Sequence, residues 1–425
     1  MNARVSRTLT LEGHIIDSMT LPRLLDVVMD LGGAFDIQEL RVGQLKTDAS
    51  FCRIEVSADS DAALDGILRQ ARTLGALPLT EEPVATAPVV AAGVYPEGFY
   101  SSSNLPTHVL VDGAWIEVER QEMDCAVAVD RRARRAWCIP FPEAEPGMEV
   151  VVGHAGVRIA PLERSRQAEI FSFMSSEVSA EKPKKMLIGR IADEMRAVRA
   201  AGGSILVVSG PAVVHTDAGQ QLSRLIELGY VQALFAGNAL AVHDVEAALF
   251  GTALGVSLAS GMPIEHGHEH HMRAINRVRA AGGLAKLVES GGLPFGVMRT
   301  AIDHGVEIVL GGSVRDDGPL PDVVTDMPSV QRRMREVIWG AGGSGPVTRL
   351  AEPVREPRVR LALLLSTMLH SIATGNLLPA LVRTICVDIN PAVVTKLADR
   401  GSWQSIGLVT DVESFLRELV LALDG

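Results

Sequence analysis

Near the end of the chain, the apolar run Thr384–Val387 ends on Asp388, and Pro391 follows where a helix would begin. In nucleotide-binding α/β domains, a carboxylate at the C-terminal tip of a strand accepts hydrogen bonds from a ribose diol. Asp388 also follows Ser366 by about 20 residues, which is the separation between phosphate turn and ribose carboxylate in such domains. We therefore expect Asp388 and Asn390 to bind the adenosine end of a dinucleotide, and the acidic residue favours NAD over NADP.

Small and polar residues follow several other apolar runs that have the composition of buried strands. Small residues let a backbone approach a pyrophosphate, and helix N-termini beside them supply N–H donors. The turn that begins at Ser366 lacks the G-x-G-x-x-G pattern, so we do not expect an ordinary Rossmann fingerprint. The residues expected to bind the cofactor are Ser209, Gly210, Pro211, Gly237, Asn238, Ala239, Gly312, Ser313, Thr367, Met368, Asp388 and Asn390.

The histidine-rich segment 266–271 is a candidate for acid–base chemistry. His271 begins a helical run, so its side chain can face a crevice while the rest of the helix packs behind it, and His243 is the alternative. A metal site would need ligands on one helix face. His266 and His270 have the i, i+4 spacing, whereas Glu269 and His271 are expected to point elsewhere, and no acidic partner for a closed site is obvious nearby. We therefore expect a catalytic or substrate-contacting histidine here and no metal.

An acidic loop is a candidate for contacts with a charged substrate. Asp316 and Asp317 lie in a stretch rich in Gly and Pro, where a carboxylate pair can bind an ammonium group or move protons. A solvated loop with Asx-turns is an equally good interpretation. The neighbouring Arg315 can pair with a phosphate or a carboxylate. Asn104 lies in a segment rich in hydroxyl and amide groups, which we expect to form a lid or a second wall of the site.

These residues need a parallel sheet whose strand tips converge on one crevice. From residue 171 to residue 425, apolar runs alternate with helical patterns, which predicts a doubly wound α/β domain with helices on both faces. The expected strands are 204–208, 233–236, 307–310, 360–365, 384–387 and 407–409. The expected helices include 185–200, 220–228, 245–249, 272–280 and 412–421.

Two smaller parts are expected before this domain. Residues 1–82 have the β-α-β-β-α order of a ferredoxin-like α+β unit. The stretch 82–92 is rich in Pro, Ala and Val, which predicts a linker. Residues 93–170 are predicted to form a small β-rich module, with short strands at 108–111, 115–118, 125–129 and 150–152.

Composition limits the class of protein. The 425 residues carry a net charge of −11 and no aromatic–basic platform, which argues against a nucleic-acid partner. The apolar runs are much shorter than the ~20 residues that span a bilayer, so no membrane association is expected, and the first residues lack the apolar core of a signal peptide. Four scattered cysteines without a CxxC pair suggest neither a zinc knuckle nor a redox dithiol. We expect a soluble, reduced, cytoplasmic protein.

Several long motifs together resemble one family. They are residues 209–216, 237–244 and 311–322, and the segment Val387-Asp388-Ile389-Asn390-Pro391. Over nearly its whole length the chain resembles the LOR/SDH bifunctional (lysine–oxoglutarate reductase/saccharopine dehydrogenase) type. Within it, the chain is similar to archaeal-type ornithine cyclodeaminases and to the C-terminal portion of cyanobacterial arginine dihydrolase/ornithine cyclodeaminases. The resemblance implies a cofactor domain of the deoxyhypusine-synthase-like NAD-binding type.

The dinucleotide crevice and the resemblance lead to one hypothesis: an NAD-dependent ornithine cyclodeaminase that forms proline and ammonia. We expect a small amino-acid substrate and a homo-oligomer. The chemistry needs a carboxylate clamp, an ammonium acceptor and an acid/base. From that chemistry, the respective candidates are Arg315 or Asn238, Asp316 or Asp317, and His271 or His243.

Two other functions stay open. The first is an amino-acid dehydrogenase of the saccharopine or lysine type with net NAD(P) turnover. The second is a non-catalytic, NAD-sensing regulatory protein whose N-terminal unit responds to amino acids. The ionisable residues at the expected strand tips favour an enzyme, because a sensor needs fewer such groups.

Overall fold

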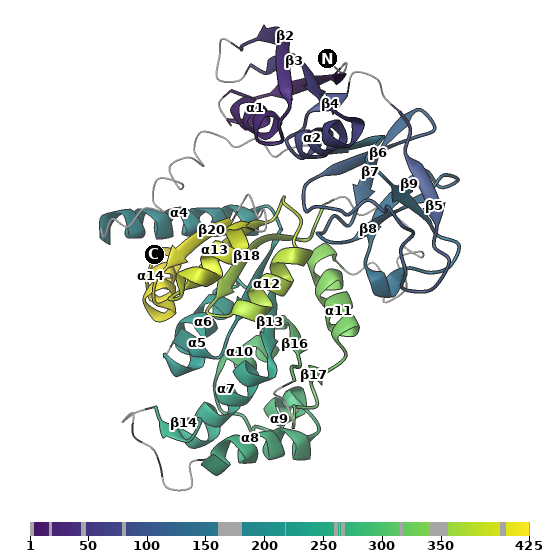
Figure 1. Ribbon diagram of the computed structural model, residues 1–425. Helices are drawn as coiled ribbons and strands as arrows, with labels where there is room; N and C mark the ends of the chain where they lie inside the picture. The colour runs from purple at the N-terminus through teal and green to yellow at the C-terminus, as the bar shows by residue number, and fades with distance from the viewer. Residues whose placement is uncertain are drawn as a thin grey trace. The chain divides into compact units, whose positions relative to one another are not determined.

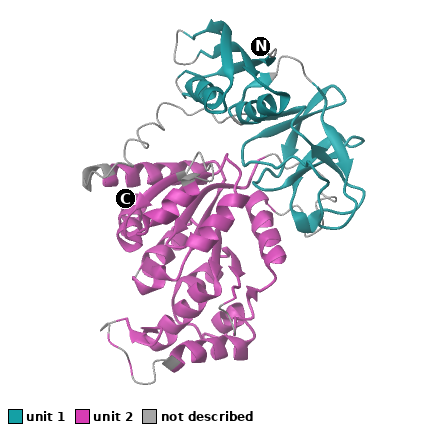
Figure 2. Ribbon diagram, in the orientation of Figure 1, with its two compact units in different colours: residues 1–175, 346–355 teal, residues 176–345, 356–425 magenta. Residues whose placement is uncertain are grey.

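The computed structural model divides into two compact units, one of residues 1–175 with 346–355 and the other of residues 176–345 with 356–425 (Figure 2). The residues that the structure describes are 4–16, 19–43, 48–78, 82–159, 181–216, 218–258, 262, 264, 268–314, 318–340, 356–399 and 405–424. Within these residues, no helix is long and apolar enough to cross a membrane.

Unit 1 begins with a four-stranded antiparallel sheet of order β2-β3-β1-β4 (Figure 1). Buried and half-buried residues alternate along β3, so one face of the sheet packs on the helices. The elements follow the order β-α-β-β-α-β, and the short fourth strand pairs with the first. The elements are β1 (Val5–Gly13), α1 (Thr20–Asp30), β2 (Ala34–Arg41), β3 (Ser50–Ala58), α2 (Asp61–Thr73) and β4 (Leu77–Pro78).

A seven-stranded sheet follows in the same unit, in the order β11-β6-β7-β9-β8-β10-β5. All four strands expected in this module are confirmed. The prediction of a linker over 82–92 was wrong in part, because Ala85–Pro88 forms β5 and pairs with β10 at the sheet edge, where a proline is tolerated. The strands are β5, β6 (Thr107–Val111), β7 (Ala114–Glu119), β8 (Ala126–Asp130), β9 (Arg135–Ile139), β10 (Glu149–Val152) and β11 (Val157–Ile159), with a 3-10 turn, η1 (Phe141–Glu143).

Unit 2 is built on a parallel sheet of order β17-β16-β13-β12-β18-β19-β20. Strands β13, β12, β18 and β19, which are neighbours in the middle of the sheet, read as continuous apolar runs because both of their faces are buried. All six expected strands are present, and only the two-residue β17 was not predicted. The strands are β12 (Ser204–Ser209), β13 (Ala233–Gly237), β16 (Glu307–Gly311), β17 (Val323–Val324), β18 (Val359–Leu365), β19 (Arg383–Asp388) and β20 (Ser405–Val409).

Two groups of helices pack on this sheet (Figure 1). Right-handed connections place them on opposite faces, because the chain runs outward from β12 in one direction and from β18 in the other. The first group is α4 (Glu181–Ala200), α6 (Ala218–Glu227), α7 (Asn238–Phe250), α10 (Val297–Asp303) and α14 (Val412–Asp424). The second is α11 (Met327–Trp339), α12 (Met368–Leu377) and α13 (Pro391–Asp399).

Smaller elements extend unit 2 beyond α7. The β14–β15 hairpin and α8 follow α7 in sequence, and α8 packs against it. The remaining elements are α5 (Ala212–His215), β14 (Thr252–Ala253), β15 (Val256–Ser257), α8 (His268–Ala281) and α9 (Leu284–Glu289).

Helix α7 is longer than the sequence predicted, because it begins at Asn238 and not at residue 245. Most of its residues are buried, polar ones included, so it lacks the one-sided apolar stripe that marks a surface helix. Asp244 is one of these buried polar residues, with 4% of its surface exposed. Its two carboxylate oxygens accept the backbone N–H groups of Val297 at 2.9 Å and Met298 at 2.8 Å. The side chain thereby satisfies the orphan donors at the start of α10.

We predict that Asp244→Ala lowers the free energy of unfolding by about 1–3 kcal/mol, because two buried N–H groups lose their acceptor. Chemical denaturation followed by circular dichroism measures this loss. Asp303→Ala is the control, since Asp303 forms only a solvent-exposed ion pair with Arg299 on the same helix, worth at most ~1 kcal/mol. Equal losses in the two variants would contradict the assigned role of Asp244.

Candidate functional site

The tips of β12 and β18 approach each other closely at the point where the sheet reverses its direction of winding. A Cβ atom on Gly210 would lie 2.1 Å from the backbone oxygen of Ser366, so only glycine fits there. Ser366 itself has a φ of 49°, which is uncommon for a residue with a side chain. Ligands of doubly wound sheets bind in the crevice at such a switch point, where bare backbone can approach a pyrophosphate.

Asp388 ends β19, and 8% of its surface is exposed. Its Oδ1 atom accepts the backbone N–H of Asn390 at 2.8 Å, and the Oδ1 atom of Asn390 accepts that of Ala392 at 3.0 Å. These two bonds form the turn into α13, which begins at Pro391 as the sequence predicted. In the described part of the chain, the Oδ2 atom of Asp388 has no hydrogen-bond partner, which is the arrangement that a ribose hydroxyl needs.

The imidazole of His370, on α12, lies over the tips of two further strands. A Cβ atom on Gly237 would approach its Cε1 atom to 2.9 Å, and one on Gly311 would approach its Nε2 atom to 3.5 Å. Gly237 and Gly311 are paired residues at the C-terminal ends of β13 and β16. The small residues expected to admit a cofactor therefore also admit this histidine, which was not among the candidates chosen from the sequence.

Asn238 begins α7 directly after β13 and is buried. Its Oδ1 atom accepts the backbone N–H of Leu320 at 3.1 Å, which holds the loop between β16 and β17. Any contact of Asn238 with a substrate carboxylate would therefore come from the amide nitrogen.

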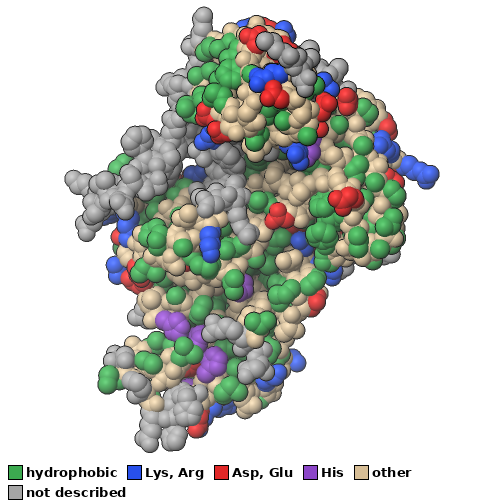
Figure 3. Space-filling model, in the orientation of Figure 1, with side chains coloured by type: hydrophobic (Ala, Val, Ile, Leu, Met, Phe, Trp, Pro, Cys, Tyr) green, Lys and Arg blue, Asp and Glu red, His purple; other side chains and the backbone are tan. Residues whose placement is uncertain are grey.

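His243 and His271 lie together on α7 and α8, with ring centroids 5.1 Å apart. The Nδ1 atoms of both rings face the Oε2 atom of Glu246, at 3.6 Å for His243 and 3.5 Å for His271. The ring of His215, at the end of α5, lies 4.8 Å from that of His243. Burial, together with the neighbouring His243, lowers the pKa of His215. In Figure 3, histidine side chains gather on one face of unit 2.

The carboxylate of Glu246 is fully buried and is held from its other side. Its Oε1 atom accepts the Oγ1–H of Thr252 at 2.8 Å and the backbone N–H of Gly255 at 2.9 Å. Burial raises the pKa of this carboxyl, but the two imidazoles and these donors outweigh burial and hold the pKa well below its usual range. Glu246 is therefore an anion that faces two imidazoles.

Glu246, His215 and His370 were not among the site residues predicted from the sequence. The signals were nonetheless present: Glu246 follows His243 by one helical turn, and His370 lies just after the β18 tip. The acidic partner that the segment 266–271 lacked in sequence is Glu246, on a different helix.

The other expected site residues fall in three places. Ser209, Pro211, Ala239, Gly312, Ser313, Thr367 and Met368 lie at or just beyond strand tips of unit 2, as expected. Arg315, Asp316 and Asp317 lie outside the described residues, as does His266. Asn104 belongs to unit 1, where it is buried, and its Nδ2 atom has no hydrogen-bond partner among the described residues.

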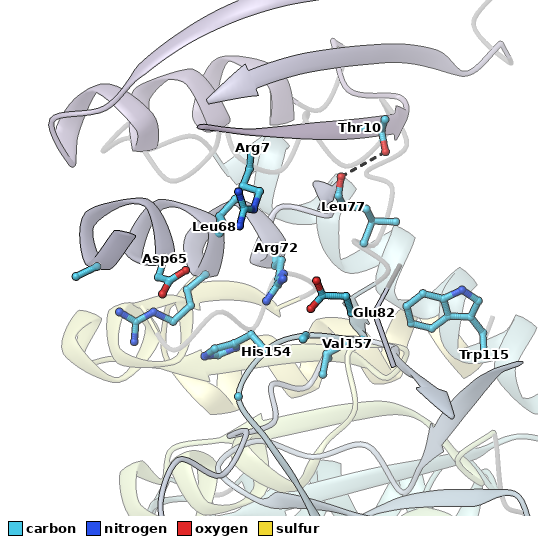
Figure 4. Close-up of a pocket in the computed structure, with 15 residues that line it drawn as sticks. Arg7, Thr10, Asp65, Leu68, Arg72, Leu77, Glu82, Trp115, His154 and Val157 are labelled. Carbon is cyan, nitrogen blue, oxygen red and sulfur yellow. Dashed lines mark hydrogen bonds between the residues drawn. The ribbon is translucent and has the colours of Figure 1, made fainter. Parts of the chain in front are cut away.

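Unit 1 contains a cavity of about 680 Å³ between α2 and the loop before β11 (Figure 4). Its lining is charged, and in Figure 4 the guanidinium of Arg72 lies between Glu82 and His154. Burial, and the nearby Arg72 and Arg69, lower the pKa of His154. The volume is in the range that holds a small molecule. The cavity lies in a different unit from the strand-tip crevice.

Comparisons with known proteins assign the chain to a family. Residues 6–105 match the LOR/SDH bifunctional enzyme conserved region, residues 106–188 the first region of the arginine dihydrolase ArgZ-like C-terminal part, and residues 189–419 its Rossmann-fold region. The ornithine cyclodeaminase of Methanopyrus kandleri is 51% identical over 97% of this chain and 96% of its own length.

Two solved structures of cyanobacterial type are also similar. Apo ArgZ, an arginine dihydrolase, has a TM-score of 0.82 and 37% identity, and the match covers all of this chain and 59% of that one. AgrE in complex with ornithine and NAD⁺ has a TM-score of 0.50 and 40% identity, over 99% of this chain and 58% of that one. The chain therefore belongs to the LOR/SDH family, in the group that includes the archaeal ornithine cyclodeaminases and the C-terminal part of ArgZ and AgrE.

Proposed function

We propose that this protein is an NAD-dependent ornithine cyclodeaminase that converts ornithine to proline and ammonia. The observation that carries the proposal is the whole-length match with proteins named ornithine cyclodeaminase, 51% identical in the first case. The complex of AgrE with ornithine and NAD⁺ supports the choice of cofactor and substrate. The strand tips of unit 2, where ligands of doubly wound sheets bind, are the proposed place for both.

The residues of the crevice fit a dinucleotide. Gly210 and Gly237 lie at the tips of β12 and β13 without a side chain, and the space that a Cβ atom would take is filled by Ser366 and His370. We propose that a pyrophosphate lies beyond these tips, against the backbone. Asp388 is placed to accept the ribose hydroxyls at the other end of the cofactor. Because no glycine-rich fingerprint is present, we assign the domain to the deoxyhypusine-synthase-like type of dinucleotide domain, as the sequence motifs suggest.

When bound, NAD⁺ supplies the hydride acceptor for the ornithine Cα–H bond and the hydride donor that completes proline. The protein must bind the substrate carboxylate, accept its ammonium group, exclude water and move protons between nitrogen atoms. For the carboxylate we propose Arg315 or the amide nitrogen of Asn238, and for the ammonium Asp316 or Asp317. Asn104 is proposed as a further substrate contact.

We assign the acid/base role to His370 on geometric grounds. It is the imidazole over the strand tips, whereas the Nδ1 atoms of His243 and His271 face Glu246. His271 with His243, which the sequence favoured, is the alternative assignment.

The other two functions differ in what they produce. A dehydrogenase acting on saccharopine or another amino acid accumulates NADH in proportion to product, whereas a cyclodeaminase recycles the cofactor within each turnover. A regulatory protein binds NAD without turnover, and the charged cavity of unit 1 would then hold its amino-acid effector. We also propose that the chain forms a homo-oligomer.

Incubation with ornithine and NAD⁺ well below the substrate concentration is predicted to yield proline and ammonia in equal amounts, with almost no NADH absorbance. Amino-acid analysis, an ammonia assay and absorbance at the NADH band measure the three quantities. Saccharopine, lysine and arginine serve as control substrates. Stoichiometric NADH would support the dehydrogenase, and NAD binding without any product would support the regulatory protein.

Asp388→Ala is predicted to weaken NAD binding by about 10-fold or more, because a hydrogen bond to a charged group contributes about 1.5–3 kcal/mol. Isothermal titration calorimetry measures the affinity, and circular dichroism checks the fold. Asp388→Asn is the matched control, since it keeps an acceptor for the N–H of Asn390 but loses the charge. Wild-type affinity in both variants would place the adenosine end elsewhere.

His370→Gln is predicted to lower kcat by at least about 100-fold, as expected for loss of a general acid/base, while NAD still binds. His304→Gln is the control, because His304 is an exposed histidine at the end of α10 whose Nδ1 atom lies 2.9 Å from the backbone oxygen of Thr300. If His370→Gln keeps its kcat and His271→Gln loses it, the acid/base role belongs to the His243–His271 pair.

A further inference from the structure

The side chains of His243 and His271 each leave an Nδ1 atom unsatisfied beside Glu246 in the interior of unit 2. The two Nδ1 atoms are buried and have no hydrogen-bond partner among the described residues. They lie 3.6 and 3.5 Å from the Oε2 atom of Glu246, which is longer than the 2.7–3.2 Å typical of an N–H···O hydrogen bond. Buried polar atoms without partners are rare in folded proteins, which points to a ligand for these two nitrogen atoms.

The same distances fit a tetrahedral metal ion. Zinc binds histidine nitrogen and carboxylate oxygen at about 2.0–2.2 Å, so two of its ligands in a tetrahedron lie roughly 3.3–3.6 Å apart. The two distances to Glu246 Oε2 match this edge, and the donor atoms of all three residues lie within 4.8 Å of one another. A small closing movement of the two imidazoles would complete the geometry.

The supporting contacts are those of a metal ligand. The Oε1 atom of Glu246 is held by Thr252 and Gly255, and Oε2, which faces the imidazoles, also accepts the backbone N–H of Leu254 at 3.2 Å. Thr252 is itself 3.0 Å from the Nδ1 atom of His270, on the same helix as His271. Ligating carboxylates in proteins are oriented by hydrogen bonds of this kind.

We propose that His243, Glu246 and His271 form a binding site for a divalent transition-metal ion of the zinc type. Two imidazoles and one carboxylate suit zinc, cobalt or nickel, whereas calcium and magnesium prefer oxygen ligands. Three protein ligands leave a fourth position for water, and the side chain of His215 lies beside His243 to contact it.

The ion would join elements that are separate in sequence. His243 and Glu246 come from α7, which begins at the β13 tip, and His271 comes from the first turn of α8. A bound ion would therefore fix the start of α8 against a helix that borders the crevice. This site is independent of the cofactor, and the ion takes no assigned part in the reaction.

The test is metal binding by the full chain without an affinity tag. The protein is treated with a chelator, dialysed and titrated with Zn²⁺ or Co²⁺, and the bound metal is counted by plasma mass spectrometry. We expect one ion per chain, the visible absorption of tetrahedral cobalt, and a thermal transition raised by the ion. An excess of Mg²⁺ or Ca²⁺ should not displace it.

Variants locate the ion. His271→Ala, at a partly exposed position, and Glu246→Gln are expected to weaken binding at least about 100-fold, and the control His304→Ala to keep one ion per chain. Wild-type affinity in both ligand variants would overturn the proposal, as would the absence of stoichiometric binding in the folded wild type. If the variants fail to fold, X-ray absorption of the zinc-loaded wild type decides: nitrogen and oxygen neighbours with two imidazole scattering patterns support the site, and any other set overturns it.

Discussion

The close approach of β12 and β18 at the switch point is the constraint on which the crevice depends. With the backbone of Ser366 against Gly210, there is no room for a side chain, and the two central strands end together. The chain winds outward from this pair in both directions, so every other strand tip is placed relative to it. The proposed dinucleotide would lie along the resulting edge, with Asp388 toward one end.

Helix α7 is the second determinant of the site. It carries Asn238 at its start, and then His243, Asp244 and Glu246, all of them buried. Three of these polar groups have a defined neighbour: a loop for Asn238, the start of α10 for Asp244, and a hairpin and two imidazoles for Glu246. Buried polar groups of this kind need partners, and the partners define where the surrounding elements lie.

The sequence predicted the parallel sheet well because its strands are buried on both faces and read as uninterrupted apolar runs. It predicted the turn after Asp388 because asparagine favours turns and proline favours the first position of a helix, and neither preference depends on distant contacts. It missed the first half of α7. A helix that is buried on all sides has no polar face, so its sequence lacks the apolar stripe by which a surface helix is recognised. It also missed Glu246 and His370, because their neighbours come from other elements and contacts between elements are set by the fold.

The two carboxylates of α7 also bear on how the chain tolerates changes in length. Glu246 accepts the backbone N–H of Gly255, and Asp244 accepts those of Val297 and Met298. One helix therefore fixes both ends of the segment from Gly255 to Val297. When both ends of a segment are fixed, extra residues within it add only a slowly growing entropic cost of loop closure. Insertions near residue 260 should therefore leave the spacing of β13 and β16 unchanged, which makes this stretch a suitable place to graft a protease site or a short peptide epitope.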